Sequence, residues 1–183
     1  MIQPSPGILL IADPFLKDPN FIRTVVFLCE HQVEGSFGFI LSKQFEQTID
    51  ELITDLEGYQ IPVYYGGPVQ KDTLHFLHQY PDLIPDAIKV SNNIYWGGNF
   101  ETVTALIKTK SIDLNKIKFF IGYSGWGAKQ LYSEIEEKSW LTVEATRQLV
   151  FNIPYEEVWK ASLKHLGGNY AILTNYPIDP QLN

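Results

Sequence analysis

The sequence predicts a mixed α+β fold, in which a largely antiparallel β-sheet is packed against several helices. Apolar runs of strand length outnumber segments with helical spacing by about two to one. The two kinds of segment do not alternate as βαβα, which argues against a doubly wound parallel sheet. A chain of 183 residues can bury a sizeable core, and we treat residues 1–183 as a single domain.

The first half of the chain contains four apolar runs that predict strands, at residues 7–12, 24–29, 37–41 and 62–65. The short polar loop between the second and third runs is typical of a hairpin. Residues 48–56 have apolar side chains at helical spacing, and Thr48 with Glu51 forms a capping-box pattern at their start. We therefore expect one amphipathic helix between the third and fourth strands.

In the second half of the chain, the predicted strands and helices follow one another less regularly. Residues 73–78 are expected to be extended, and residues 87–90 and 94–96 to form a hairpin around Asn92 and Asn93. Asn99 can cap a helix that continues to about Lys108. Further strands are predicted at 117–123, 140–143 and 171–174, with helices around 131–135 and from Pro154 to the Gly167-Gly168 pair.

The net charge of −7 is carried by the first half of the chain. Up to Ser91 there are 12 acidic and 5 basic residues, whereas the remainder has 9 of each. Such a chain is repelled by phosphate backbones and anionic lipid. Arg23 and Arg147 are the only arginines. We therefore predict neither direct nucleic-acid binding nor membrane binding.

Cys29 is the single cysteine, which excludes an intrachain disulfide and a cysteine-based metal cluster. It lies in an apolar run, where a small buried thiol is the expected structure. The start of the chain has no basic segment followed by a long apolar stretch. We expect a cytoplasmic protein, and we predict no metal and no cofactor.

Residues 122–127, Gly-Tyr-Ser-Gly-Trp-Gly, lie between a predicted strand and a predicted helix. The segment is similar to a nucleophile elbow, but Trp126 stands where the pattern needs its second glycine. One interpretation is a glycine-rich turn with Trp126 as a packing anchor. The other is an anion site made by backbone N–H groups, with Arg23 or Lys129 as the nearby cation. No catalytic residue is predicted.

Other charged and metal-binding residue types each allow a structural interpretation beside a functional one. Arg23 could pair with Asp13 or Asp18, or it could bind a substrate anion. His75 and His78 would point to opposite faces of a strand and could not share a metal ion. Two charged segments are each expected to be solvated surface, with docking of a charged partner as the alternative. One is an acidic stretch at residues 46–57. The other is a lysine group that consists of Lys108, Lys110, Lys116 and Lys118.

Several motifs, in the same order along nearly the whole chain, resemble the AlgH/YqgE family. At the start these are Gly7-Ile-Leu-Leu-Ile-Ala-Asp-Pro14, Asp18-Pro-Asn-Phe-Ile-Arg-Thr-Val-Val26, and His31 followed by Gly35-Ser-Phe-Gly38. Later motifs are Gly66-Gly-Pro-Val69, Leu77-His78, residues 122–127, Gln130-Leu131, Glu134-Ile135 and Trp140.

The resemblance implies a bacterial cytoplasmic protein with a compact mixed α/β fold and no established biochemical activity. Some family members are labelled as transcriptional regulators. The residues of this chain give that label no support, because there is no helix-turn-helix pattern and little arginine. The family commonly has Pro-Gly after Trp-Gly, where this chain has Ala128 and Lys129, and it often has alanine or serine at the position of Ser124.

The prediction is a non-catalytic regulatory or interaction module, whose partner is an unknown protein or a small anionic ligand. The alternative is an enzyme or small-anion binder that uses residues 122–127 with Arg23. In either case we expect three turns to converge on one concave surface: the turn near Arg23, the turn at Gly66-Gly67-Pro68 and the turn at residues 122–127. The candidate ligand-binding residues are Arg23, Thr24, Gly66, Gly67, Ser124, Gly125 and Trp126.

Overall fold

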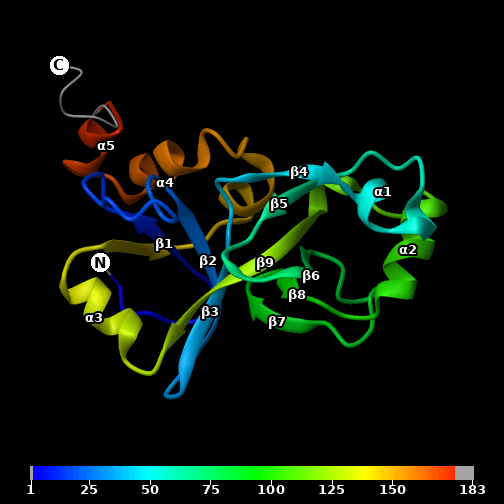
Figure 1. Cartoon of the computed structure of the whole chain (residues 1–183), viewed down its shortest axis with the longest axis horizontal. Coiled ribbons are helices and arrows are strands. Elements are labelled where there is room, and N and C mark those ends of the chain that lie inside the picture. Colours follow the sequence, from blue (N-terminus) through cyan, green and yellow to red (C-terminus); the bar gives the residue numbers. More distant parts are fainter. Residues whose placement is uncertain (1, 176–183) are drawn as a thin grey trace.

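A computed structural model of the protein describes residues 2–175. It contains a mixed sheet that is curled and mostly antiparallel, with strand order β10-β1-β2-β3-β9-β6-β8-β7 (Figure 1). The α+β class predicted from the sequence is confirmed. The strands are β1 Ile8–Ala12, β2 Val25–Gln32, β3 Gly35–Ile40, β4 Gln44–Thr48, β5 Pro62–Tyr65, β6 Val69–His78, β7 Ile88–Ser91, β8 Ile94–Trp96, β9 Ile117–Gly127 and β10 Trp140–Glu144.

The helices pack on the sheet or cap its ends. They are α1 Ile49–Leu52, α2 Phe100–Lys108, α3 Gln130–Glu136, α4 Val158–Leu166 and α5 Tyr170–Leu173, with 3₁₀ turns at Thr54–Leu56 and Leu114–Lys116 and a π-helical turn at Gln148–Asn152. Asn99 caps α2 by accepting a hydrogen bond from the Thr102 N–H at 2.8 Å. No helix among residues 2–175 is long and apolar enough to cross a membrane.

Strand β9 is the centre of the sheet because it pairs with three other strands. It pairs with β6 along much of its length, with β5 in parallel, and with β3 through residues 124–127. The predicted strand at 117–123 is therefore longer than expected. Residues 122–127 are strand and not turn, because Gly35 and Phe37 of β3 continue the ladder opposite Gly127 and Gly125.

The sheet separates the core into layers. Leu9 and Phe27 belong to the cluster that packs with Trp159 and Leu163 of α4. The alternate residues of the same strands point to the opposite cluster, which contains Trp126 and Leu131. A third cluster joins β5, β6 and β9 to α1 and α2 at the other end of the molecule. In Figure 1, α1 and α2 lie at the end of the sheet remote from α3 and α5.

Three further local features differ from the sequence prediction. The expected helix at 48–56 keeps its capping box but stops at Leu52, since Ile53 is extended (φ −125°). Strand β4 was not anticipated from the sequence. The expected strand at 171–174 is instead α5, because a short apolar run does not distinguish strand from helix and here local bonds such as Ile172 N–H to the Asn169 carbonyl (3.2 Å) prevail.

Candidate functional site

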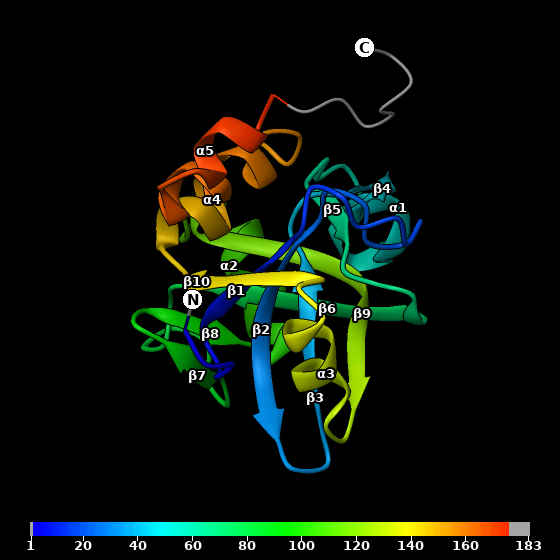
Figure 2. The same cartoon turned by 90° about the vertical axis from the view of Figure 1, so that its left-hand side faces the viewer.

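An open, largely apolar groove of about 580 Å³ lies where the β2–β3 hairpin meets β6, β8 and β9. Its aromatic walls are Phe37, His75, Trp96 and Tyr123, each of them half-buried. A volume of this size is typical of a ligand-binding site. Figure 2 shows the hairpin projecting beyond the body of the sheet, with α3 beside it.

The aromatic walls stand at steep angles to one another. The ring centroid of Phe37 lies 4.9 Å from that of Trp96 and 5.8 Å from that of Tyr123, with interplanar angles of 63° and 72°. The His75 ring is almost perpendicular to Tyr123, at 86° and 6.0 Å. Edge-to-face contacts of this kind favour a fixed arrangement. The groove is therefore preformed by strands that are far apart in the sequence.

A cross-strand row of three residues connects the acidic rim of the groove to its floor. Phe37 on β3 lies opposite Glu30 on β2 and opposite Gly125 on β9. Residues opposite one another in a ladder project from the same face of a sheet. Gly125 lacks a side chain, so it leaves open the space beside Tyr123 and Val69, which a Cβ atom would contact at 3.4 Å and 3.9 Å. Glu34 also lines the groove, and both glutamates are exposed.

His75 has a buried Nε2 atom with no hydrogen-bond partner among the described residues. Burial lowers the pKa of the imidazole, which favours the neutral form. His75 also lines a second hollow of about 360 Å³ together with Trp96. The two hollows thus share one imidazole and one indole in their linings.

A second histidine fixes the hairpin to α3. His31 Nδ1 is 2.6 Å from Ser36 Oγ, and its Nε2 is 3.1 Å from the Tyr132 hydroxyl. A serine next to a histidine can act as a nucleophile with its base. Here, however, Ser36 is paired with His31 in β2 and with Trp126 in β9, so its backbone belongs to the sheet on both sides. We interpret this contact as a support for the groove wall. No sequence spacing had indicated it.

Three of the predicted site residues lie where two backbone segments cross beneath the groove. They are Gly66, Gly67 and Ser124. The Gly66 N–H donates to the Ile121 carbonyl at 2.8 Å, and its own carbonyl accepts from Ile40. The fully buried hydroxyl of Ser124 donates to the same Gly66 carbonyl at 3.1 Å. A Cβ atom on Gly67 would lie 2.2 Å from the Tyr123 carbonyl carbon. These residues hold strands together by close approach of their backbones.

Arg23 and Trp126 are not brought to one surface. The guanidinium carbon of Arg23 lies 4.9 Å from the centroid of the Trp159 ring, on the α4 side of the sheet. The Trp126 indole belongs to the cluster on the other side and is 5% exposed. Thr24 is fully buried, and its hydroxyl donates to the Phe21 carbonyl at 2.9 Å. Gly125 and Trp126 are the predicted residues that line the groove.

Lys118 is buried, so the expectation that all four lysines of the group are solvated is wrong for this residue. Its side chain is 6% exposed, its Nζ donates to the Val150 carbonyl at 3.0 Å, and it lies 4.3 Å from the centroid of Tyr64. Burial lowers the pKa of Lys118 to about 8. The other three lysines of the group are exposed, as expected. Among residues 2–175, no three or more His, Cys, Asp or Glu side chains are grouped so that they could hold a metal ion.

Comparison with known proteins identifies the family. The AlgH-like family model matches residues 9–171. A UPF0301 protein of Chlorobium limicola is 46% identical over 97% of this chain and 95% of its own, and one of Cytophaga hutchinsonii is 40% identical over 97% and 98%. The solution structure of the AlgH protein from Pseudomonas aeruginosa superposes with a TM-score of 0.75 at 30% identity, covering 97% of this chain and 98% of that one. A crystal structure of a Corynebacterium diphtheriae protein has a TM-score of 0.81 at 21% identity, over 96% and 94% of the two chains, and so shares the fold. The chain therefore belongs to the AlgH-like family.

Proposed function

We propose that this protein is a non-catalytic interaction module that binds a segment of a partner protein in the aromatic groove. The observation that carries the proposal is the groove itself, with Phe37, Trp96 and Tyr123 in its walls and Gly125 in its floor. Tryptophan and tyrosine supply much of the binding energy at protein interfaces, especially when they surround a pocket. A partly exposed cluster of these rings is the kind of surface that a partner side chain can fill.

The alternative of an enzyme or small-anion binder built on residues 122–127 and Arg23 has less support. Ser124 is fully buried and donates its hydroxyl to Gly66, and Arg23 lies against Trp159 on the other side of the sheet from Trp126. Glu30 and Glu34 at the rim would repel an anion. The same two carboxylates and the net charge of −7 argue for a protein partner over nucleic acid.

The proposal includes a cytoplasmic location. Cys29 is buried in the strand that borders the groove, and burial raises the pKa of its thiol well above the usual value. A thiol of this kind is unreactive. One reduced, buried cysteine in the whole chain suits a reducing compartment.

The experiment uses random peptides displayed on phage and selected on the wild-type protein. Gly125→Leu should fill the floor of the groove, whereas Gly127→Leu places the same side chain two residues further along β9, where a Cβ atom meets only Gln130 Oε1 at 3.9 Å. Neither glycine has a positive φ, so a strand residue fits both positions. Circular dichroism and thermal melting check the fold of each variant.

The expected result is a set of peptides that bind the wild type and Gly127→Leu equally and bind Gly125→Leu about tenfold more weakly or worse. Selected peptides whose affinity does not change in Gly125→Leu would show that the groove is not the interaction site. Failure to select any peptide would equally overturn the proposal.

A further inference from the structure

The rim of the groove has a definite charge. Glu30 and Glu34 line it and are exposed, whereas no lysine or arginine is among the described residues that line it. An apolar groove with carboxylates at its mouth attracts a cation and discriminates against an anion. The chain as a whole has the same sign, with a net charge of −7.

The aromatic walls favour the same ligand chemistry. A cation is attracted to the face of an aromatic ring, most strongly to tryptophan and also to tyrosine and phenylalanine. Two cations of this chain already lie over such rings: Lys118 over Tyr64 at 4.3 Å and Arg23 over Trp159 at 4.9 Å. Trp96 and Tyr123 offer rings of the same type in the groove, where a cation has to come from a partner.

The row Glu30, Phe37 and Gly125 fits one long basic side chain. Neighbouring strands are about 4.8 Å apart, so the backbone positions of Glu30 and Gly125 are separated by about 10 Å across Phe37. Arginine and lysine have an apolar stem and a charged head, which suits a surface that is apolar at one end and acidic at the other. The stem would lie over Gly125, and the head would lie between Glu30 and the aromatic walls.

The surface next to the groove favours a macromolecular partner over a small free cation. Val33, at the tip of the same hairpin and next to the groove-lining Glu34, is 85% exposed. A small ligand would use only the hollow. A protein segment would also cover the apolar side chain of Val33.

We propose that the partner segment is basic, and that one arginine or lysine side chain occupies the groove between the glutamates of the rim and the rings of Trp96 and Tyr123. This inference rests on the proposed function, since it specifies the chemistry of what the groove binds. It adds that binding depends on the two carboxylates and weakens with salt.

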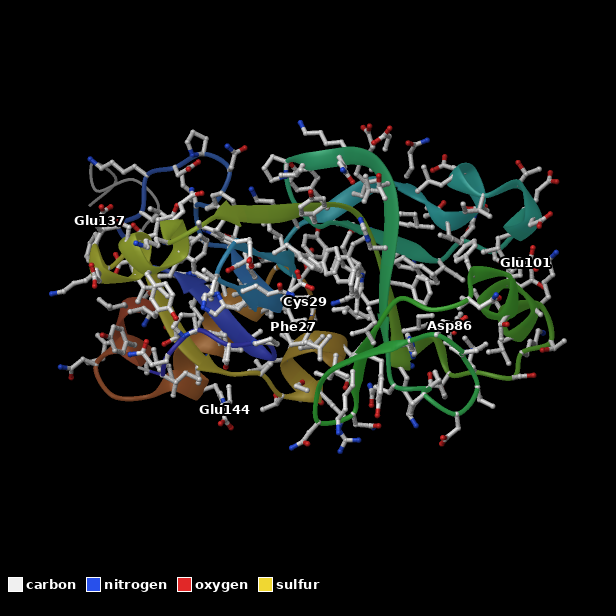
Figure 3. All side chains as sticks on the ribbon, turned by 90° about the horizontal axis from the view of Figure 1, so that it is seen from below. Phe27, Cys29, Asp86, Glu101, Glu137 and Glu144 are labelled. Atoms are coloured by element: carbon white, nitrogen blue, oxygen red, sulfur yellow. The ribbon has the colours of Figure 1, made fainter. Side chains whose placement is uncertain are left out.

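The experiment compares two double variants with the same change in net charge. Glu30→Gln/Glu34→Gln neutralises the rim. Glu57→Gln/Glu101→Gln neutralises two exposed glutamates at the α1–α2 end of the molecule; Figure 3 labels Glu101 at the end opposite Glu137, with Cys29 near the middle. The probes are the selected peptides, each made with arginine or lysine and with the uncharged analogue citrulline or norleucine. Affinities are measured at low and physiological salt.

Enrichment of arginine or lysine in the selected peptides is expected, with about tenfold weaker binding by the rim variant or by the uncharged peptide and little change for the control variant. Peptides that need the groove but bind equally well without the basic residue would overturn the inference and leave the proposed function intact. If no peptide depends on Gly125, both fail. If N-acetylarginine amide binds as tightly as the peptides, the groove is a small-cation site and the protein partner is wrong.

Discussion

The carboxylate of Glu134 accepts a hydrogen bond from the indole N–H of Trp126 at 2.8 Å. The same oxygen, Oε2, accepts from the indole N–H of Trp140, also at 2.8 Å, while Oε1 accepts from the Gln130 amide at 2.9 Å. One side chain of α3 therefore satisfies two indoles of the sheet. Because Trp126 is in the strand that forms the floor of the groove, this contact connects α3 to the site.

Replacement of Glu134 should destabilise the protein selectively. We expect Glu134→Ala to lower the free energy of unfolding by about 2–3 kcal/mol, because two part-buried indole N–H groups lose their acceptor. Glu136→Ala, at an exposed position on the same helix, should change it by about 0.5 kcal/mol or less. Urea unfolding followed by tryptophan fluorescence measures both. Equal effects would mean that the two indole bonds contribute no net stability.

Gly67 should tolerate no side chain. Its φ is +153°, and a Cβ atom would collide with the backbone of Tyr123 and Ser124. We expect Gly67→Ala to cost about 2–4 kcal/mol. Gly58 also has a positive φ (+85°) but nothing within 4 Å of its Cβ position, so Gly58→Ala should cost about 1 kcal/mol of strain alone. Thermal and urea unfolding compare them, and similar losses would contradict the account of the backbone crossing.

Lys118 should make stability increase with pH in mildly alkaline solution. Its pKa is about 8 in the folded protein and 10.5 in the unfolded chain. Between these values the unfolded state binds the additional proton, so the folded state gains stability as pH rises, by up to about 1.4 kcal/mol per pH unit. Unfolding curves of the wild type and Lys118→Met between pH 7.5 and 9.5 test this. The free energy of unfolding of the wild type, relative to that of Lys118→Met, should increase with pH. Parallel pH profiles of the two proteins would refute the prediction.

His78 should make the stability of the fold decrease as pH falls in mildly acidic solution. The Tyr80 N–H donates to Nδ1 at 3.1 Å, so Nε2 carries the proton and donates to the Gly97 carbonyl at 2.9 Å. Burial lowers the pKa of His78 below its usual 6.5, although the bond to Gly97 opposes this. The neutral form is thus favoured by folding, and its stabilisation is complete above pH 6.5 and lost as pH falls.

The test of His78 is the loss of stability between pH 7 and pH 5. His78→Gln should be less stable than the wild type at pH 7 but should lose less on acidification. His165→Gln, at an exposed position on α4, should follow the wild-type profile. A wild-type acid response that survives in His78→Gln would assign the effect to other groups, such as His75.

Local sequence patterns determined most of the secondary structure. Apolar runs such as residues 8–12 are long enough for a strand and too short for a helix, and the caps at Thr48 and Asn99 depend on hydrogen bonds within a few residues. The distribution of charge along the chain was equally predictable, since the sequence alone showed that the first half is acidic. These features depend on neighbours in the chain, so they can be inferred without the fold.

The groove was decided by the tertiary structure. Four strands supply Phe37, His75, Trp96 and Tyr123, and strand pairing brings each ring within about 6 Å of two of the others. The glycines of residues 122–127 predicted a turn, although β3 continues them as a strand. The sequence drew attention to Gly125 and Trp126 but could not show that Arg23 lies on the other side of the sheet from the Trp126 indole, because the side to which a strand residue points depends on register.

Lys118 illustrates the same limit. In Ile-Lys-Phe-Phe, residues 117–120, the alternation of strand side chains puts Lys118 on the same face as Phe120. A charge within such an apolar run was the one available signal of an unusual lysine. Whether that face meets water or protein depends on the π-helical turn at Gln148–Asn152, whose Val150 carbonyl accepts the ammonium hydrogen bond. The sequence by itself determined which residues could form strands and helices, whereas contacts between distant segments decided which side chains became buried, paired or exposed in a groove.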